Sequence, residues 1–265
     1  MSGPSDTWGE ADAYEGYVGR WSRPVAIQFL EWLAVPSAHS WLDVGCGTGA
    51  LSETIARHAS PALLNGIDAS VPYLTQARRR LTGTNARMVL GLAQQMPFDS
   101  ERFDAVVSGL ALNFVPVPEA AVSEMARVAR RGGFVAAYVW DYARGMQLMR
   151  CFWDAAVALD PYAAALDEGN RFPICHPDRL EAVFRTSGLG DVESRAIDIP
   201  TRFVDFDDYW SPFLGAQGPA PGYAMSLNEE RRARLRDRIR RALPVAADGS
   251  IALTARAWAV RGRRT

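Results

Sequence analysis

The stretch Leu42-Asp43-Val44-Gly45-Cys46-Gly47-Thr48-Gly49 decides the fold, because it joins a short apolar segment to a helical pattern through three glycines at every second residue. Residues 41–44 are expected to form a buried strand and residues 50–58 the helix that follows it. Gly45 and Gly47 would let the backbone approach a ligand where any side chain would collide. The N-terminus of the following helix offers unpaired N–H groups with partial positive charge, which favours an anionic group. The stretch therefore predicts a strand, a ligand-binding loop and a helix.

Short apolar segments alternate with helical patterns from Ser40 to about Trp140. Strands that alternate with helices imply right-handed βαβ units and a parallel sheet with helices on both faces. The segments are continuously apolar, which is typical of strands buried on both sides. Besides 41–44, strands are expected at 63–67, 86–90, 103–107 and 134–139, and helices at 70–81 and 118–131, the last ended by Gly132 and Gly133.

The overall composition is that of a globular chain and excludes several classes of function. Of 265 residues, 48% are apolar and 22% charged, so disorder is not the main state. Basic and acidic residues number 29 and 30, a net charge of −1, which argues against a nucleic-acid partner. All the basic residues are arginine, so Schiff-base chemistry on a lysine amine is excluded. The three cysteines, Cys46, Cys151 and Cys175, are far apart and suggest neither a disulfide framework nor a metal site.

Nothing in the sequence indicates a membrane protein. No apolar run reaches the length of about 18 residues that a membrane-spanning helix needs. The segment Ser5 to Glu10 shows no basic region followed by an apolar block, so no signal peptide is expected. We therefore expect a cytoplasmic protein without a membrane partner.

A second acidic residue strengthens the interpretation of the glycine loop as a ligand site. Asp68 closes the second expected strand, nineteen residues after Gly49. A carboxylate at the end of that strand lies beside the first loop of a parallel sheet and can accept hydrogen bonds from both hydroxyls of a ribose. The loop and Asp68 together predict an adenosine-like ligand across the carboxyl edge of the sheet.

The glycine spacing bears on which ligand this is. A dinucleotide fingerprint would be G-x-G-x-x-G, whereas this chain has G-x-G-x-G with Asp43 two residues before the first glycine. An acid at Asp43 is poorly placed for a pyrophosphate but suits an ammonium group. Ribose, ammonium and carboxylate occur together in S-adenosylmethionine. A dinucleotide, or a glycine turn without a ligand, stays an alternative.

At these residues the chain resembles the class I S-adenosylmethionine-dependent methyltransferases, and most of all the small-molecule branch that includes ubiquinone and menaquinone biosynthesis enzymes. The resemblance covers about residues 14–140 and rests on Leu42–Gly49, Gly66–Ser70, the segment Gly91–Phe98 and the turn Gly132–Phe134. It implies an α/β fold with a doubly wound, mostly parallel seven-stranded sheet whose last strand is antiparallel. It also implies S-adenosyl-L-methionine as the cofactor.

The resemblance assigns cofactor contacts to particular positions. It places Asp43, Gly45, Cys46 and Gly47 at the methionine end, although Cys46 carries no chemistry of its own in this interpretation. The remaining implied contacts are Asp68 and Ala69 at the ribose, Ala93 and Gln94 at the adenine, Ser108 and Leu110 after the fourth strand, and Tyr17, Arg20 and Trp21 in a helix folded over the cofactor. The family often has an acid at the position of Leu92, where this chain cannot accept a hydrogen bond from the adenine amino group.

A side-chain base is needed only when the methyl acceptor is a hydroxyl or a protonated amine. His176 follows the fifth strand, where the family often places acceptor contacts, so we consider it as a base or acceptor ligand; the alternative is a cap on a helix near Asp178. His39 and His58 are expected to be structural. Asn113 and Tyr142, just past the fourth and fifth strands, either reach the acceptor or serve their own loops.

The regions outside the core are expected to form a cap and inserts. Residues 205–225 have a loop-like pattern rich in aromatic residues, which favours a lid over an apolar or aromatic acceptor; a packed surface loop is the alternative. The pattern from Ser226 to Glu229 is a capping box and predicts a helix over 226–243. Further helices are expected over 11–34 and 143–160, and strands over 192–203 and 250–261. The predicted organisation is one domain, 1–265, with cap helices at 1–35, a cofactor-binding core at 40–140 and substrate-side inserts at 141–190 and 205–245.

The function we expect is methyl transfer from S-adenosylmethionine to a small organic acceptor at oxygen, nitrogen or carbon, without a metal ion. Two alternatives stay open at this point. One is a nicotinamide-dependent oxidoreductase on a similar sheet, and the other is a domain that holds the cofactor without transferring a methyl group.

Overall fold

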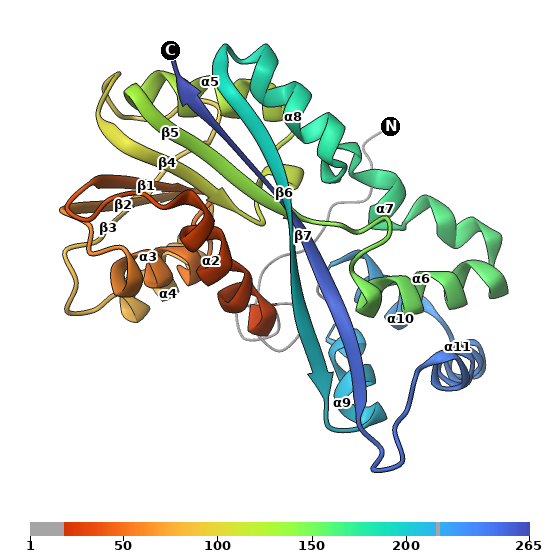
Figure 1. Ribbon diagram of the computed structural model, residues 1–265. Helices are drawn as coiled ribbons and strands as arrows, with labels where there is room; N and C mark the ends of the chain where they lie inside the picture. The colour runs from red at the N-terminus through yellow and green to blue at the C-terminus, as the bar shows by residue number, and fades with distance from the viewer. Residues whose placement is uncertain (1–18, 216–217) are drawn as a thin grey trace. The chain divides into compact units, whose positions relative to one another are not determined.

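The computed structural model describes residues 19–215 and 218–265, and it divides into two compact units (Figure 1). We call them the sheet unit and the helical unit. The sheet unit comprises Ser22–Trp140, Ile174–Ile197 and Ala257–Thr265. Of the described residues, the helical unit comprises 19–21, Asp141–Pro173, and Asp198–Arg256 apart from 216–217. None of the helices within the described residues is long and apolar enough to cross a membrane.

One seven-stranded sheet, in the order β3-β2-β1-β4-β5-β7-β6, organises the chain. Strands β1 to β5 pair in parallel, and β7 pairs antiparallel with β5, from Phe134 opposite Arg263 to Trp140 opposite Ala257. This confirms the doubly wound, mostly parallel fold and its antiparallel last strand. The strands are β1 (Ser40–Val44), β2 (Leu63–Asp68), β3 (Arg87–Leu90), β4 (Phe103–Gly109), β5 (Ala129–Trp140), β6 (Leu189–Phe203) and β7 (Ile251–Arg264).

Helices cover both faces of the sheet within the sheet unit. Figure 1 shows α3 and α4 together on one side and α5 and α8 on the other. This arrangement explains why β1 is buried along its whole length and why β5 is buried from Gly133 to Trp140. The helices of this unit are α2 (Arg20–Leu33, of which Ser22 onward belongs here), α3 (Ala50–His58), α4 (Val71–Arg80), α5 (Pro118–Val128) and α8 (Pro177–Thr186).

The helical unit is built around packed aromatic rings. Phe152 stacks on Phe213 with 4.5 Å between ring centroids, and the Tyr209 hydroxyl donates a 2.9 Å hydrogen bond to the Leu148 carbonyl. Its elements are α6 (Gln147–Leu159), α7 (Glu168–Arg171), α9 (Phe206–Trp210), α10 (Pro219–Ser226) and α11 (Glu229–Ala242), with 3₁₀ turns at Pro161–Ala165 and Ser211–Leu214.

Three predicted elements are wrong in detail. The region 205–225 is not loop-like, because its rings bury one another and draw the chain into α9, a 3₁₀ turn and α10; Phe206, Tyr209, Trp210, Phe213 and Tyr223 are all buried. Helix α5 ends at Val128 rather than residue 131, because Ala129 is extended and pairs with Phe103 of β4.

The capping box is also wrong. Asn228 caps α11 by accepting a 2.9 Å hydrogen bond from the Arg231 amide, so this helix begins at Glu229. Ser226 instead belongs to α10 and donates its hydroxyl proton to the Tyr223 carbonyl. An asparagine can satisfy the same unpaired N–H groups at a helix N-terminus as the expected serine. Ser226 and Asn228 are therefore both plausible N-caps in the sequence, and the structure uses Asn228.

Candidate cofactor site

The loops that follow β1, β2, β3 and β4 meet at one edge of the sheet. Val44 lies opposite Ile67, and Asp43 lies opposite both Gly66 of β2 and Val107 of β4. Because these strands are parallel and adjacent, their carboxyl ends open onto a common crevice, which is where ligands bind in doubly wound folds. The sheet therefore brings together the glycine loop, Asp68 and the segments after β3 and β4.

The glycine loop is shaped by backbone conformations that favour glycine. Gly45 has φ +70°, and a Cβ there would lie 2.5 Å from the Cβ of Ala111. Gly47 has φ +53°, and a Cβ there would meet no atom within 4 Å. The first glycine is thus required by packing against the chain itself. The second faces open space, which leaves its backbone accessible to a ligand.

Asp68 ties the glycine loop to the end of β2. Its two carboxylate oxygens accept hydrogen bonds from the Gly47 amide at 2.9 Å and from the Ser70 amide at 2.8 Å. The side chain is half-buried, and each carboxylate oxygen has lone pairs beyond the one these bonds use. Asp68 therefore holds the loop in shape and keeps the capacity to accept hydrogen bonds from a ribose.

Asp43 is a buried carboxylate, and one of its two oxygens has no hydrogen-bond partner among the described residues. Its side chain is 1% exposed, and Oδ2 accepts a 2.7 Å hydrogen bond from the Ser52 hydroxyl. Oδ1 is buried and has no hydrogen-bond partner within the described residues. Burial raises the pKa of Asp43 to about 7, with a smaller contribution from the charge of Asp68, and against the lowering effect of the Ser52 hydrogen bond. A cation at Oδ1 would supply what this carboxylate lacks.

Sequence reasoning missed Ser52. Its hydroxyl lies in the first turn of α3 and is fully buried. A buried hydroxyl needs a hydrogen-bond partner, and Asp43 in the preceding strand provides it. A polar residue on the inner face of the helix after the glycine loop is the signal that could have identified it.

Cys46 turns its side chain away from the loop surface. Its sulfur lies 3.8 Å from that of Met88, and it packs in an apolar cluster with Leu74, Ala77 and Leu81. Burial raises the pKa of its thiol well above the ordinary value, so the group stays protonated and unreactive. Any ligand contact at this position comes from the backbone.

The loop after β4 carries a second strained turn and an unpaired amide. Leu110 has φ +59° and donates its N–H to the Tyr138 carbonyl at 2.8 Å, while Ser108 is buried in the strand. Asn113 is also buried, and its side-chain nitrogen has no partner among the described residues. A buried amide donor without a partner favours a ligand role over the alternative of hydrogen bonding within the loop.

The segment after β3 is an open turn. Ala93 and Gln94 are half-buried there, and Leu92 is 56% exposed and forms an isolated bridge with Gln95. Ala69, after β2, is exposed. The exposed apolar surface of Leu92 suits contact with the flat adenine ring. Because Leu92 is not an acid, hydrogen bonds to the adenine would have to come from Gln94 and the backbone.

Two of the three predicted contacts from the N-terminal helix belong to the helical unit. The Arg20 guanidinium donates a 2.9 Å hydrogen bond to Asp208 and lies 4.6 Å and 4.7 Å from the ring centroids of Trp21 and Phe203. Both residues therefore have structural partners there, and their contact with a cofactor stays a prediction. Tyr17 lies outside the described residues.

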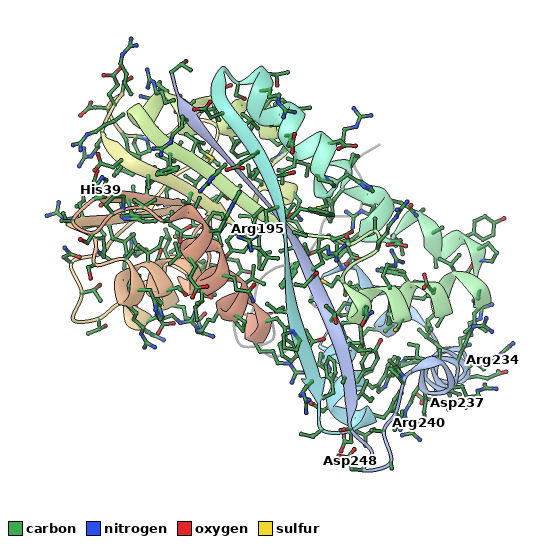
Figure 2. All side chains as sticks on the ribbon, in the orientation of Figure 1. His39, Arg195, Arg234, Asp237, Arg240 and Asp248 are labelled. Atoms are coloured by element: carbon green, nitrogen blue, oxygen red, sulfur yellow. The ribbon has the colours of Figure 1, made fainter. Side chains whose placement is uncertain are left out.

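The three histidines occupy the ends of elements. His176 is exposed at the N-cap position of α8, as the alternative expected, although within the described residues its ring makes no capping hydrogen bond. Its role as a base stays a prediction. His39 lies where β1 begins, away from the glycine loop (Figure 2), and its ring is 3.0 Å from the Ser37 carbonyl. His58 is exposed in the last turn of α3.

These residues fit an adenosine-like ligand that carries an ammonium group. Asp68 offers acceptors for a ribose, Gly47 faces open space, and Asp43 has a buried oxygen without a partner. A pyrophosphate fits worse, because two acidic side chains would face its negative charge.

Comparisons with known proteins agree with this geometry. The profile of a family described as "Methyltransferase domain" matches residues 42–137. Demethylmenaquinone methyltransferase from Roseiflexus castenholzii is 33% identical over 180 residues, which is 63% of this chain and 74% of that protein. Fatty-acid O-methyltransferase from Mycolicibacterium smegmatis is 36% identical over 93 residues, 35% of this chain and 34% of that protein.

A solved structure shares the fold. Phosphoethanolamine N-methyltransferase 2 from Haemonchus contortus, in complex with S-adenosyl-L-methionine, superposes with a TM-score of 0.59 over 96% of this chain and 56% of that one, at 15% identity. At that identity the likeness extends to the fold alone.

Proposed function

The chain belongs to the class I S-adenosylmethionine-dependent methyltransferases, and we propose that it methylates a small organic acceptor of apolar or aromatic character at oxygen, nitrogen or carbon. The observation that carries the cofactor assignment in this chain is the pairing of the open glycine loop with the unsatisfied oxygen of Asp43. A nicotinamide enzyme would not need a buried acid at that point.

The residues at the edge of the sheet would divide the cofactor between them. Asp68 would accept hydrogen bonds from the ribose hydroxyls, and Asp43 would face the ammonium group. The backbone from Gly45 to Gly47 and the segment from Ser108 to Leu110 would border the methionine end, with Ala69 beside the ribose and Ala93 and Gln94 at the adenine. Tyr17, Arg20 and Trp21 are proposed to cover it. When bound, the cofactor supplies an electrophilic methyl group on a sulfonium sulfur.

The protein's part in the reaction is mainly to orient the acceptor and exclude water. We place Asn113 at the acceptor, because its buried amide nitrogen has no other partner among the described residues. For a hydroxyl or protonated amine, His176 would remove the proton, since its exposed imidazole ring carries a nitrogen that can act as a general base. The apolar character of the acceptor is supported by the relatives, which include a demethylmenaquinone methyltransferase and a fatty-acid O-methyltransferase. The enzyme is proposed to work in the cytoplasm.

Calorimetric titration with S-adenosylhomocysteine, in parallel with NADH, tests the cofactor assignment. Wild type should bind the first and not the second. Asp68→Ala should bind S-adenosylhomocysteine roughly ten- to hundredfold more weakly, because a charge-assisted hydrogen bond contributes about 1.5–3 kcal/mol. Asp99→Ala, which removes an exposed acid beyond the adenine segment, is the matched control and should bind normally. Unchanged affinity in Asp68→Ala would remove the ribose assignment.

A further inference from the structure

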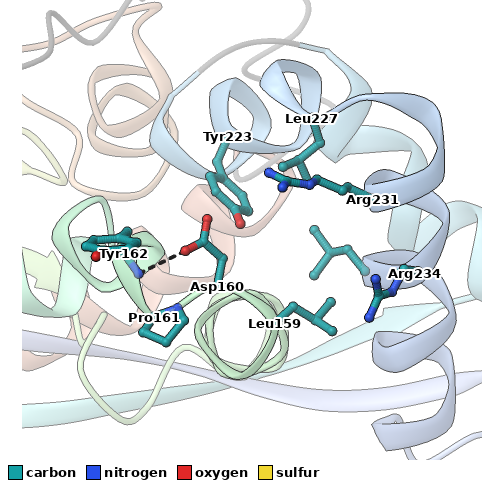
Figure 3. Close-up of a pocket in the computed structure, with 9 residues that line it drawn as sticks. Leu159, Asp160, Pro161, Tyr162, Tyr223, Leu227, Arg231 and Arg234 are labelled. Carbon is teal, nitrogen blue, oxygen red and sulfur yellow. Dashed lines mark hydrogen bonds between the residues drawn. The ribbon is translucent and has the colours of Figure 1, made fainter.

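The helical unit contains a cavity of about 410 Å³, and none of the residues assigned above to the cofactor or to proton removal lines it. It lies between α6, the 3₁₀ turn after it, α10 and α11 (Figure 3). That volume is in the range of pockets that bind small molecules, roughly 300–1,000 Å³. Its lining consists of Leu159, Asp160, Pro161, Tyr162, Tyr223, Leu227, Arg231, Arg234 and Leu235.

Two arginines of α11 line this cavity without an acidic partner. Arg231 and Arg234 are three residues apart, so they are neighbours on one face of the helix. Within the described residues, neither guanidinium forms an ion pair. By contrast, Arg236 lies 3.5 Å from Asp207, and Arg240 lies 4.3 Å from the ring centroid of Phe206. Arg231 and Arg234 thus bring positive charge to the cavity wall without an acidic partner among the described residues.

The rest of the wall is mostly apolar, with one acid that is already engaged. Leu159 lies beside Arg234, and Tyr223 presents its ring on the other side (Figure 3). Leu235 is a further apolar residue of the lining. Asp160 accepts a 3.0 Å hydrogen bond from the Tyr162 amide at the start of the 3₁₀ turn. Burial, and to a lesser degree the charge of Asp160, raises the pKa of Tyr223, so its hydroxyl keeps its proton and can donate.

We propose that this cavity binds a small amphipathic carboxylate, with its head group on Arg231 and Arg234 and its apolar body against Leu159 and Leu235. A guanidinium presents paired N–H donors that match the two oxygens of a carboxylate. Two arginines against the single acid Asp160 leave the site with an excess of positive charge. The apolar wall distinguishes it from a site for a bare inorganic anion, which would gain nothing from the leucines. The inference does not depend on the methyl transfer proposed above.

Calorimetric titration of the full chain with decanoate, below its micelle concentration, tests the proposal. Decanoate should bind at one site, while decanamide, which has the same chain without the charge, and inorganic phosphate, which has charge without the chain, should each bind at least about tenfold more weakly. Arg234→Gln and Arg231→Gln should each weaken decanoate binding by about tenfold or more.

Arg240→Gln is the matched control, because it removes the same charge from a different side of the same helix (Figure 2). It should bind decanoate within about twofold of wild type. All three variants should bind S-adenosylhomocysteine like wild type, which also reports that the chain is folded. Equal binding of decanoate and decanamide, an equal loss in Arg240→Gln, or no saturable decanoate binding would each overturn the proposal. If wild type binds decanoate as expected but does not bind S-adenosylhomocysteine, the result would count against the proposed function and not against this cavity.

Discussion

Replacing Asp43 by asparagine should change how the stability of the protein depends on pH. In the folded chain the pKa of Asp43 is raised to about 7 from an ordinary value of 3.8, chiefly by burial. Between these two values the folded state binds more protons than the unfolded state, so the free energy of unfolding falls as the pH rises. Asp43→Asn removes this dependence.

The size of this change in the free energy of unfolding follows from the pKa shift of Asp43. At about 1.4 kcal/mol per pH unit, moving the pKa from 3.8 to about 7 corresponds to roughly 4 kcal/mol. The new amide would present donors where Oδ1 has no partner, which costs about 1–3 kcal/mol at every pH. The absolute difference between variant and wild type therefore mixes two contributions, whereas its slope with pH reports only the carboxyl group.

Urea denaturation of the cofactor-free protein between about pH 5 and pH 8 measures this slope. The stability of Asp43→Asn relative to wild type should rise by about 1.4 kcal/mol per pH unit up to about pH 7 and then level off. Asp104→Asn is the control, because hydrogen bonds from Ser40 and Arg130 outweigh burial and lower the pKa of Asp104 to about 2, so its difference should be constant over the same range. Parallel profiles for wild type and Asp43→Asn would refute a buried carboxyl that titrates near neutrality.

Two further substitutions test the packing that supports each unit. Gly45→Ala should destabilise the sheet unit and reduce S-adenosylhomocysteine binding, because its Cβ would lie 2.5 Å from that of Ala111 at a left-handed backbone position; normal binding and an unchanged melting temperature would contradict the geometry of the loop. Phe213→Ala should cost about 3–5 kcal/mol of unfolding free energy in chemical denaturation, because it leaves a hole beside Phe152 in the helical unit; a loss below about 1 kcal/mol would mean that this ring is not part of a packed core.

The sheet and its ligand edge were open to prediction from sequence alone. The strand, glycine loop and helix at Leu42–Gly49 and the acid at the end of β2 are local patterns, and the handedness of βαβ units turns them into neighbours in space. For the same reason Asp43, Gly47 and Asp68 could be placed together before any coordinates were known. The antiparallel direction of the last strand came from resemblance, and the order β5-β7-β6 came only from the structure, because local pattern does not specify where a late strand joins the sheet.

Tertiary structure decided whatever depends on contacts between distant residues. The region 205–225 has the composition of a loop, but its aromatic rings pack against Phe152 and against one another. The burial of these rings outweighs the weak helical propensity of the segment. The free oxygen of Asp43, the inward turn of Cys46 and the unpaired arginines around the cavity are likewise invisible in sequence, because each is defined by what other parts of the chain leave unfilled. Periodicity determines which elements form, whereas packing determines which polar groups are left for a ligand.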